Sequence, residues 1–347
     1  MRLTGNMMSS RVSFKALTER LQRILERAGC SSIVAAQLAS NCAGAERDGA
    51  RSHGIFRMQG YVSSLRGNWV DGHAVPRVED VAAGFVRVDA KNGYAVPALA
   101  AASELAINKA RHNGVAVIAI RNSHHLGALA LDVEPFAERG LVAIAIVNSM
   151  KSVVPHGGRL PVFGTNPIAF ASPRASGAPF VFDQASSAMA HGDVKIAMRE
   201  GRTLPPGIGV DRHGEPTSDP AEIVGGGALR TFGGHKGASI AIMVEVLCAA
   251  LAGGQFSFEC DLAAMPGAST PRTGQTLLLI DPRTGSAGLA DFATRVDELL
   301  AQVLAAGQSR LPGERRLAIR EQSLRDGIEL SVDELASLDL LEAQFEA

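Results

Sequence analysis

Apolar residues recur three and four positions apart over the first 66 residues of the chain, which is the spacing of one face of a helix. A serine precedes each of three such segments: Ser13, Ser32 and Ser52. Serine is a preferred N-cap residue, so these positions mark the expected starts of three helices. The third helix is expected to end at about Arg66.

Past residue 80 the pattern changes to short apolar runs bounded by glycine, asparagine or proline, which is typical of strands. The runs 115–120 and 141–147 flank a predicted helix over 126–139, in which Pro135 would introduce a kink. Two continuous apolar strands around one helix predict parallel pairing inside an α/β layer. The full set of expected strands is 84–88, 115–120, 141–147, 167–171, 180–182 and 275–280.

Four later segments complete the predicted architecture. Residues 204–227 are rich in proline, glycine and aspartate and should form a long surface loop. Residues 237–251 are apolar on nearly every face, so we expect a buried helix there. The chain should close with helices over 288–305 and 331–345, the last of which starts with a Ser-x-x-Glu capping-box motif.

The composition is that of a globular protein without a charge bias. Hydrophobic residues make up 46% of 347 positions, and 34 Lys and Arg stand against 35 Asp and Glu, so the net charge is -1. This balance argues against nucleic acid or a membrane surface as the partner and favours a small molecule. The N-terminus lacks the apolar run of a signal peptide, and no apolar stretch is long enough to span a bilayer.

The cysteines are few and scattered. Their spacing contains no CxxC, which argues against a zinc site and against a secreted disulfide framework, and no metal is expected. A reduced cytoplasmic interior fits this usage best. The four positions are Cys30, Cys42, Cys248 and Cys260.

The densest chemistry of the chain lies in residues 51–57. On a helix His53 and Arg57 would face one small molecule together, with an imidazole to give a proton and a guanidinium to hold a carboxylate. The positive end of that helix would lower the pKa of His53. Taken alone, the segment is equally compatible with a capping Ser52, a solvated histidine and a surface arginine. Asp193 is either a carboxylate that orients His53 or the cap of the short helix that follows it.

Three further segments are candidates for ligand contacts. Residues 122–127 follow a predicted strand, at the edge where α/β folds bind ligands, and no carboxylate or cysteine completes a metal set around their paired histidines. Residues 231–237 form a glycine-rich turn before a helix, and its exposed backbone amides together with Lys236 would suit a dinucleotide phosphate. They do not match GxxxxGK[ST], and no GxGxxG follows a strand, so a Rossmann domain is disfavoured. The turn 307–314 is a helix terminator or a second phosphate contact.

Taken in order, four blocks of residues resemble the type-2 malate/L-lactate dehydrogenase family, and the match covers nearly the whole chain. They are Ser52-His53-Gly54 with Arg57; Asn122-Ser123-His124-His125-Leu126-Gly127; Val154-Pro155-His156-Gly157-Gly158 leading to Phe163-Gly164-Thr165-Asn166-Pro167; and Gly233-Gly234-His235-Lys236-Gly237. Within that family the chain is most similar to the Δ1-piperideine-2-carboxylate/Δ1-pyrroline-2-carboxylate reductases. That closer likeness lies in SHGIFR, Asp132-Val133-Glu134-Pro135-Phe136, Val147-Asn148-Ser149-Met150 and Ala190-His191-Gly192-Asp193.

The resemblance implies a non-Rossmann α/β fold with a mixed sheet, a homodimer, and the NADPH-dependent reduction of cyclic imine carboxylates to L-pipecolate and L-proline. The expected division of the chain is a helical lobe over 1–78 that packs with a C-terminal helical segment over 315–347. Between them lies an α/β region over 79–314 that binds cofactor and substrate.

The resemblance also implies roles for single residues. His53 is the proton donor, Ser52 and Asp193 form its relay, and Arg57 holds the substrate carboxylate. The implied NADPH contacts are His124, His125, Leu126, Gly127, Ala128, Asp183, Gln184, Ala185, His235, Lys236, Gln308, Ser309, Arg310, Leu311, Pro312, Gly313 and Glu314. The chain departs from the pattern of its relatives at Gln184, Ser186 and Lys151.

Two other functions stay open. A 2-oxo acid needs the same proton donor and carboxylate anchor as an imine, so a dehydrogenase of a linear 2-hydroxy acid such as malate, lactate or ureidoglycolate is the alternative. A protein that kept the fold and binds ligand without catalysis is the third possibility. The residues do not decide between NADPH and NADH, because no group can be placed at the ribose 2′ position without a fold.

Overall fold

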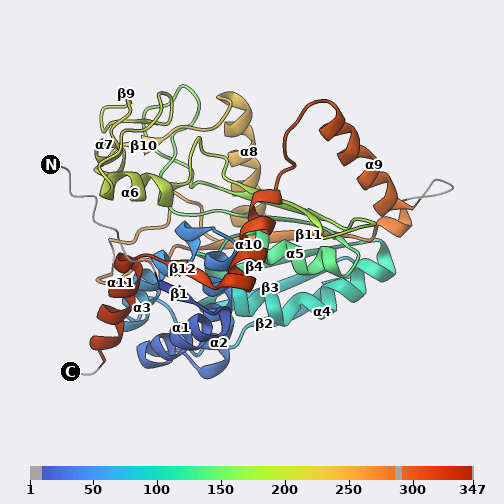
Figure 1. Ribbon diagram of the computed structural model, residues 1–347, viewed down its shortest axis with the longest axis horizontal. Coiled ribbons are helices and arrows are strands. Elements are labelled where there is room, and N and C mark those ends of the chain that lie inside the picture. Colours follow the sequence, from blue (N-terminus) through green and yellow to red (C-terminus); the bar gives the residue numbers. More distant parts are fainter. Residues whose placement is uncertain (1–9, 264, 286–290, 346–347) are drawn as a thin grey trace.

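The computed structural model describes residues 10–263, 265–285 and 291–345, and a seven-stranded sheet forms its centre (Figure 1). All six apolar runs that predict strands form strands of this sheet. From one edge to the other the order is β2 (Arg77–Ala82), β3 (Phe85–Tyr94), β4 (Val115–His124), β11 (Arg272–Ile280), β5 (Val142–Val147), β6 (Ile168–Ser172) and β7 (Phe180–Gln184).

The sheet is mixed, as the resemblance implies. β3 and β4 pair in parallel, whereas every other neighbouring pair is antiparallel. The predicted parallel pairing of 115–120 with 141–147 is wrong, because β11 lies between β4 and β5 and opposes Leu278 to Val117 on one side and to Ile144 on the other. β4 and β5 still run in the same direction, so their C-terminal ends share one edge of the sheet.

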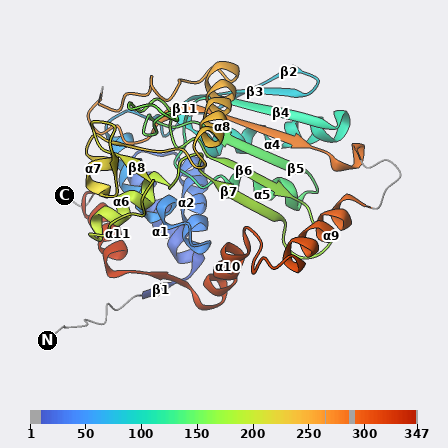
Figure 2. The ribbon, with the colours of Figure 1, turned by 90° about the horizontal axis from the view of Figure 1, so that it is seen from above.

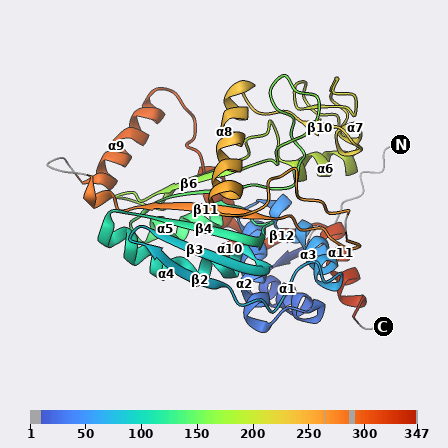
Figure 3. The ribbon, with the colours of Figure 1, turned by 180° about the vertical axis from the view of Figure 1, so that it is seen from behind.

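Helices cover both faces of the sheet (Figure 3). α4 (Ala95–Asn113) and α5 (Ala130–Glu138) pack on one face, and α8 (His235–Glu245) lies on the other, where a π-helical turn (Val246–Leu251) continues it. Pro135 lies inside α5, which is shorter than the predicted helix over 126–139.

The segment 237–251 is helical but is not buried on every face, so that prediction is wrong in part. Its inner side packs on the sheet through Val244 and Cys248, which are fully buried. Its outer side stays open, since Ile242 is 51% exposed and Val246 is 50% exposed. We call this exposed apolar strip of Ile242, Met243, Val246 and Leu251 the α8 strip.

A helical lobe is built from both ends of the chain. Strand β1 (Ser10–Val12) pairs with β12 (Ile328–Leu330), and one apolar core joins N-terminal Leu21 to C-terminal Leu338. The three-part division of the chain into 1–78, 79–314 and 315–347 stays a prediction. The helices of this lobe are α1 (Phe14–Ala28), α2 (Ser32–Arg47), α3 (Met58–Arg66), α10 (Glu314–Asp326) and α11 (Val332–Ala343).

Two predicted helix starts are confirmed at atomic detail. The Ser13 hydroxyl accepts a hydrogen bond from the Ala16 N–H and caps α1. α11 begins with the predicted capping box of Ser331 and Glu334. The cap of α2 is Ser31, one residue before the predicted one.

A smaller lobe lies on the α8 side of the sheet. The predicted loop over 204–227 belongs to this lobe and is not a simple loop, because it contains two short strands and one short helix. The elements of the lobe are α6 (His191–Arg199), β8 (Gly209–Val210), β9 (Pro216–Thr217), α7 (Pro220–Val224) and β10 (Ala228–Leu229). The predicted helix over 288–305 is observed as α9 (Phe292–Ala305), and residues 288–290 lie outside the described part.

Candidate active site

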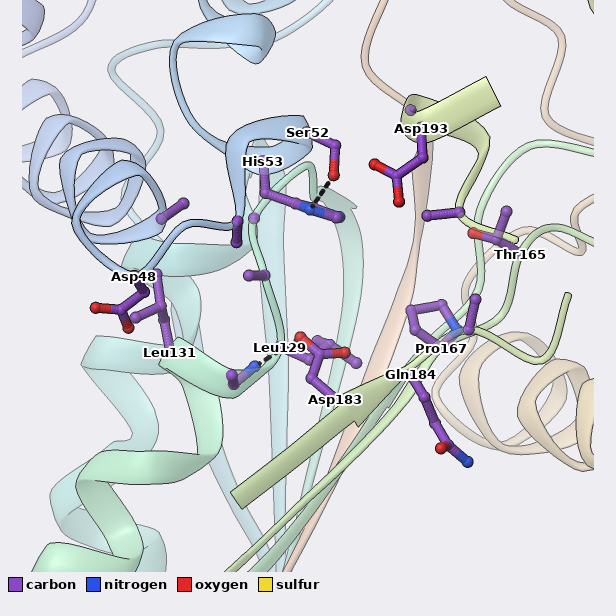
Figure 4. A pocket seen from close by; sticks show the side chains of 18 of the residues that line it. Asp48, Ser52, His53, Leu129, Leu131, Thr165, Pro167, Asp183, Gln184 and Asp193 are labelled. Carbon is purple, nitrogen blue, oxygen red and sulfur yellow. Dashed lines mark hydrogen bonds between the residues drawn. The ribbon is translucent and has the colours of Figure 1, made fainter. Parts of the chain in front are cut away.

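A cavity of about 970 Å³ opens at the edge of the sheet where β4, β5 and β7 end. Its walls come from the helical lobe, from these strand ends and from α6 of the smaller lobe (Figure 4). The turn before α10 also lines it. Ser52, His53, Arg57 and Asp193 all line it. The residues proposed for catalysis from the sequence therefore meet in one cavity, although they come from two separate lobes.

The segment 51–57 forms two consecutive 3-10 turns, Arg51–His53 and Ile55–Arg57, rather than the start of one α-helix. Gly54 separates them with φ −99° and ψ −127°, outside the helical region. The α-helix begins only with α3, so the predicted helix start at Ser52 is wrong. We call residues 51–57 the double turn, and each of its two turns brings a polar side chain to the cavity.

The imidazole of His53 is largely buried and is oriented by the residue before it. The Ser52 Oγ lies 3.1 Å from the His53 Nδ1. Burial, together with the charges of Arg57 and His125, lowers the pKa of His53 to about 3. The lowered pKa agrees with the sequence-based expectation, but its cause is desolvation and not a helix end. His53 is thus a neutral imidazole near pH 7.

Arg57 is a largely buried cation without an anionic partner in the described chain. Its Nε makes no hydrogen bond there, and burial lowers its pKa. The guanidinium lies over the Phe56 ring, 5.4 Å from the centroid, and Arg199 of α6 approaches the same ring at 5.2 Å. An unpaired buried charge is unfavourable, so this arrangement is suited to an anion that enters from the cavity.

Asp193 belongs to the first turn of α6 and directs its carboxylate toward the space beside the His53 ring (Figure 4). No hydrogen bond joins it to that ring among the described residues. The alternative that Asp193 caps the helix is wrong, because the N-cap is Ala190 and no side chain caps this end. α6 approaches the double turn closely at Gly192, where a Cβ would lie 2.8 Å from the Ser52 Cβ.

Sequence reasoning missed two cavity residues of α6, His191 and Lys195. Burial lowers the pKa of His191 to about 4, with further contributions from Lys195 and Arg57. Burial and the charge of Arg57 also lower the pKa of Lys195. Their spacing of four on one helix, on either side of Asp193, is the signal that would have placed them on the same face.

Two carboxylates lie near the strand ends, Asp183 on β7 and the buried Asp132 on α5. The Asp183 Oδ2 accepts a hydrogen bond of 2.9 Å from the Ala130 N–H, and burial raises the pKa of Asp183 to about 6. Asp132 lies 2.9 Å from the His125 Nε2 and accepts a hydrogen bond of 2.7 Å from the Gln275 Nε2. These bonds hold the loop after β4 against β7 and β11, where the predicted cofactor contacts lie.

The structure brings most of the implied cofactor residues to the cavity, and five lie outside its lining. Those in the lining are His125, Leu126, Gly127, Ala128, Asp183, Gln184, Ala185, Gln308, Arg310, Leu311, Pro312 and Gly313. Those outside it are His124, His235, Lys236, Ser309 and Glu314.

His124 is separated from His125 because β4 continues four residues past its predicted end at 120. Successive residues of a strand point to opposite faces. The His124 ring is therefore buried elsewhere, with its Nδ1 2.8 Å from the Thr270 Oγ1 and its Nε2 3.1 Å from the Asn92 Oδ1. His235 packs instead on His156, with ring centroids 6.0 Å apart.

A buried ion network holds the far wall of the cavity. α10 lies beside α2 and near β7 (Figure 2). Arg316 bonds Asp48 at 3.0 Å and Glu134 at 2.8 Å, and Arg320 bonds the same two carboxylates at 2.8 and 2.6 Å. Burial alone would raise the pKa of Asp48 and of Glu134, but the arginines hold both below their usual values. Sequence reasoning missed this network, which joins residues 268 apart.

Three remaining expectations concern groups outside the cavity. Lys151 is exposed and does not line it. Within the described residues, no three His, Cys, Asp or Glu side chains are placed to hold a metal ion. Among those same residues we find no helix with the length and apolar character needed to cross a membrane.

The chain is similar to known proteins over almost its whole length. Residues 12–339 match the family model described as malate/L-lactate dehydrogenase. A Δ1-pyrroline-2-carboxylate/Δ1-piperideine-2-carboxylate reductase of Pseudomonas putida is 58% identical over 94% of this chain and 96% of its own. A (2R)-3-sulfolactate dehydrogenase (NADP+) of Chromohalobacter salexigens is 38% identical over 91% of this chain and 93% of its own.

Solved structures give the same result. The crystal structure of Δ1-piperideine-2-carboxylate reductase from Pseudomonas syringae pv. tomato is 59% identical, covers 96% of this chain and 99% of its own, and superposes with a TM-score of 0.92. A malate dehydrogenase of Entamoeba histolytica, 22% identical, covers 98% of this chain and 99% of its own and shares the fold with a TM-score of 0.89. The chain therefore belongs to the malate/L-lactate dehydrogenase family and is an oxidoreductase with a nicotinamide cofactor.

Proposed function

We propose that this protein reduces the cyclic imines Δ1-piperideine-2-carboxylate and Δ1-pyrroline-2-carboxylate to L-pipecolate and L-proline with NADPH. The observation that carries the proposal is the largely buried, unpaired Arg57 next to a neutral His53 in one cavity. A carboxylate on Arg57 would place the adjacent C=N bond near the imidazole. The reductases at 58% and 59% identity support the choice of a cyclic imine.

The cavity suits a nicotinamide dinucleotide in size and in charge. Its far end is lined by Arg310 and Arg315, two exposed cations that form no ion pair within the described chain. Such cations are suited to phosphate groups, and their number favours the additional phosphate of NADPH over NADH. The bound cofactor supplies a hydride to the substrate C2.

His53 supplies the proton that balances the hydride. When hydride reaches C2, the C=N bond becomes a single bond and the nitrogen takes a proton to become a secondary amine. With the Ser52 hydroxyl donating to Nδ1, the imidazole carries its own proton on Nε2, which it donates to the substrate nitrogen. The low pKa of His53 makes the neutral ring, rather than an imidazolium, the donor at neutral pH.

Ser52 and Asp193 complete the proton path. After His53 gives up its Nε2 proton, the Ser52 hydroxyl proton moves to Nδ1, so the serine must be reprotonated. Asp193 of α6 lines the cavity and is exposed to solvent, which suits a carboxylate that passes protons inward from water. The substrate carboxylate also offsets the charge of Arg57, which is one of the causes of the low pKa of His53.

A comparison of substrates tests the proposal. Purified protein with NADPH is assayed on both cyclic imines, on oxaloacetate and on pyruvate. We expect at least one imine to exceed both oxo acids in kcat/KM by about tenfold or more, which corresponds to about 1.4 kcal/mol of transition-state preference. A linear oxo acid that exceeds both imines by that factor would overturn the assignment.

One observation favours the alternative, a dehydrogenase of linear 2-hydroxy acids. Lys195 lies close enough to Arg57 for the charge of Arg57 to lower its pKa, and it has no ion-pair partner in the described chain, so it would suit a second anionic group on the substrate. The variant His53→Ala distinguishes an enzyme of either kind from a protein that only binds its ligand. We expect this variant to bind NADPH with unchanged affinity and to lose turnover, and wild-type turnover would remove His53 from the mechanism.

We also propose that the protein acts as a homodimer in the cytoplasm. The α8 strip supports a partner copy, because a contiguous exposed apolar surface is typical of protein interfaces. All four cysteines are buried and free, which fits a reducing compartment. Sedimentation of wild type and of Ile242→Asp with Val246→Asp tests the dimer, and a wild-type monomer would contradict it.

A further inference from the structure

The double turn is supported from behind by a buried carboxyl group, that of Glu46 on the last turn of α2. Its Oε1 accepts a hydrogen bond of 2.6 Å from the Ile55 N–H. Within the described residues no cation lies at ion-pair distance from it, in contrast to nearby Asp48. Glu46 does not line the cavity, so it does not touch the substrate.

The Ile55 N–H needs such a partner. It is the first amide of the second 3-10 turn, and the first amides of a helical turn have no partner within the turn. The residue before it is Gly54, which has no side chain that could act as a cap. Ile55 is buried, and a buried amide without a hydrogen bond costs about 1–3 kcal/mol. The Glu46 carboxyl group therefore satisfies the junction between the two turns.

The packing at this junction is too close for a side chain. A Cβ on Gly54 would lie 2.2 Å from the Glu46 Oε1 and 2.5 Å from its Cδ. Gly54 thus permits the carboxyl group to reach the backbone, and the two residues form one contact. This contact lies between His53, which ends the first turn, and Arg57, which ends the second.

We propose that Glu46 is a positioning residue for the reaction, which fixes His53 and Arg57 relative to each other by holding the Gly54–Ile55 junction. The inference rests on the proposed roles of these two residues. A proton donor and a carboxylate anchor act on neighbouring atoms of one small substrate, so their relative placement sets the rate. A displacement of about 1 Å in such a pair can cost about 100-fold.

The hydrogen bond needs an acceptor oxygen and not a charge. Burial raises the pKa of Glu46 to about 7, so the neutral form is readily reached. A glutamine keeps an oxygen at this position, whereas a leucine of similar size does not. A comparison of Glu46→Gln with Glu46→Leu therefore separates the effect of the hydrogen-bond acceptor from the effect of side-chain volume.

The experiment measures kcat, KM and the NADPH dissociation constant for both variants, together with their thermal unfolding. We expect Glu46→Leu to lose about 10- to 100-fold in kcat/KM, with NADPH affinity within about twofold of wild type, because the implied cofactor contacts lie on other segments. Glu46→Gln should stay within about threefold of wild type. Full activity of a folded Glu46→Leu, or an equal loss in both variants, would overturn the proposal.

A second route keeps the test valid if Glu46→Leu fails to fold. Gly54→Ala pushes the carboxyl group from the junction, and Glu46→Ala removes the obstructing atoms. We expect Gly54→Ala to lose activity, and adding Glu46→Ala to cost less than it does in wild type. Strictly additive losses in this double-mutant cycle would show that the two residues do not act as one contact.

Asp281 provides the matched control. It is buried, it accepts a hydrogen bond of 3.0 Å from the Arg283 N–H, and it follows the end of β11 opposite to the cavity. Asp281→Leu should lower stability and leave kcat unchanged. All rates are measured on the substrate that the wild-type protein reduces fastest. If the imine assignment is wrong, the wild-type rates show it, and the ratio of each variant's rate to the wild-type rate still tests the role of Glu46.

Discussion

The two ends of the cavity differ in how their charges are paired. At the double turn Arg57 is largely buried without an anion, and His53 is held neutral. At α10, Asp48 and Glu134 are buried with Arg316 and Arg320, and each carboxylate bonds both arginines. The network of Asp48, Glu134, Arg316 and Arg320 is complete in the free protein. The double turn, under the proposed function, gains its anion only when a ligand binds.

The physical cost explains why the difference matters. A buried ion pair contributes little net stability, but losing one partner leaves a buried charge and costs about 3–5 kcal/mol. Removing a charge that has no partner does not carry that cost. Replacing an arginine should therefore harm folding at one end of the cavity and harm catalysis at the other.

The largest effect is expected for Arg57→Met. Loss of the carboxylate anchor should reduce kcat/KM by about 100- to 1000-fold, because a charge-assisted pair to a bound ligand is worth about 2–5 kcal/mol. Unfolding of the free protein should be unchanged or occur at higher denaturant concentration, since an unpaired buried charge is removed. Steady-state kinetics and urea titrations check both parts.

Arg199→Met is the control for Arg57→Met. Arg199 lies over the same Phe56 ring, but it is exposed and does not line the cavity. Its loss should change kcat/KM by less than about threefold, because an exposed cation–π contact is worth about 0.5–1 kcal/mol. Equal losses in the two variants would mean that the ring contact, and not the carboxylate, determines the effect.

Arg320→Met tests the network at α10. It leaves Asp48 and Glu134 with Arg316 and Arg47 only, so the free energy of unfolding should fall by about 3–5 kcal/mol. Arg295→Met, which removes the exposed pair with Glu298, should change it by less than about 1 kcal/mol. Chemical denaturation measures both, and similar values for the two would show that the buried network is no stronger than a surface pair.

The smallest expected effect concerns Glu46→Gln and pH. The pKa of Glu46 is raised from 4.5 to about 7 in the folded state, so the folded state binds more protons and stability falls as pH rises through this window. Glutamine cannot ionise, so its stability advantage over wild type should widen by about 2 kcal/mol from pH 5 to pH 8. A gap that stays constant with pH would show that Glu46 titrates normally.

The carboxylates of the α10 network should respond to pH in the opposite sense. The folded pKa values of Asp48 and Glu134 lie below their usual values, so the stability that these groups contribute is lost as pH falls. Stability should therefore fall toward high pH because of Glu46 and toward low pH because of Asp48 and Glu134.

Local patterns were enough to predict most elements. Alternating and continuous apolar runs identified six strands of the sheet, and serine caps identified the first helix and the last. The same reasoning failed for the double turn, where it predicted the start of an α-helix. Apolar residues after Ser52 have helical spacing, but Gly54 interrupts the helix, and the buried Glu46 of the preceding helix accepts the hydrogen bond of the Ile55 N–H. The spacing of apolar residues does not indicate which side chain will bond a backbone amide.

Long-range pairing was the second limit. Nothing in the runs 115–120 and 141–147 indicates that β11 will separate them, because these runs and the apolar residues 277–280 of β11 fit any position inside a sheet. The ion network could not be predicted for the same reason, since it depends on a contact between Arg316 and Asp48, which are distant in the chain. The residues proposed for catalysis nevertheless meet in one cavity, and their proposed roles depend on residue type and order more than on exact backbone geometry.

The position of β11 also has a consequence for how the chain is made. During synthesis β4 and β5 leave the ribosome long before residue 280, so each exposes an unpaired edge while the central place in the sheet is empty. The cavity wall from α10 and the core strand β12 appear later still. The nascent protein therefore completes this cavity only after β11 and α10 have been made, and until then its open strand edges are the segments most in need of chaperone protection.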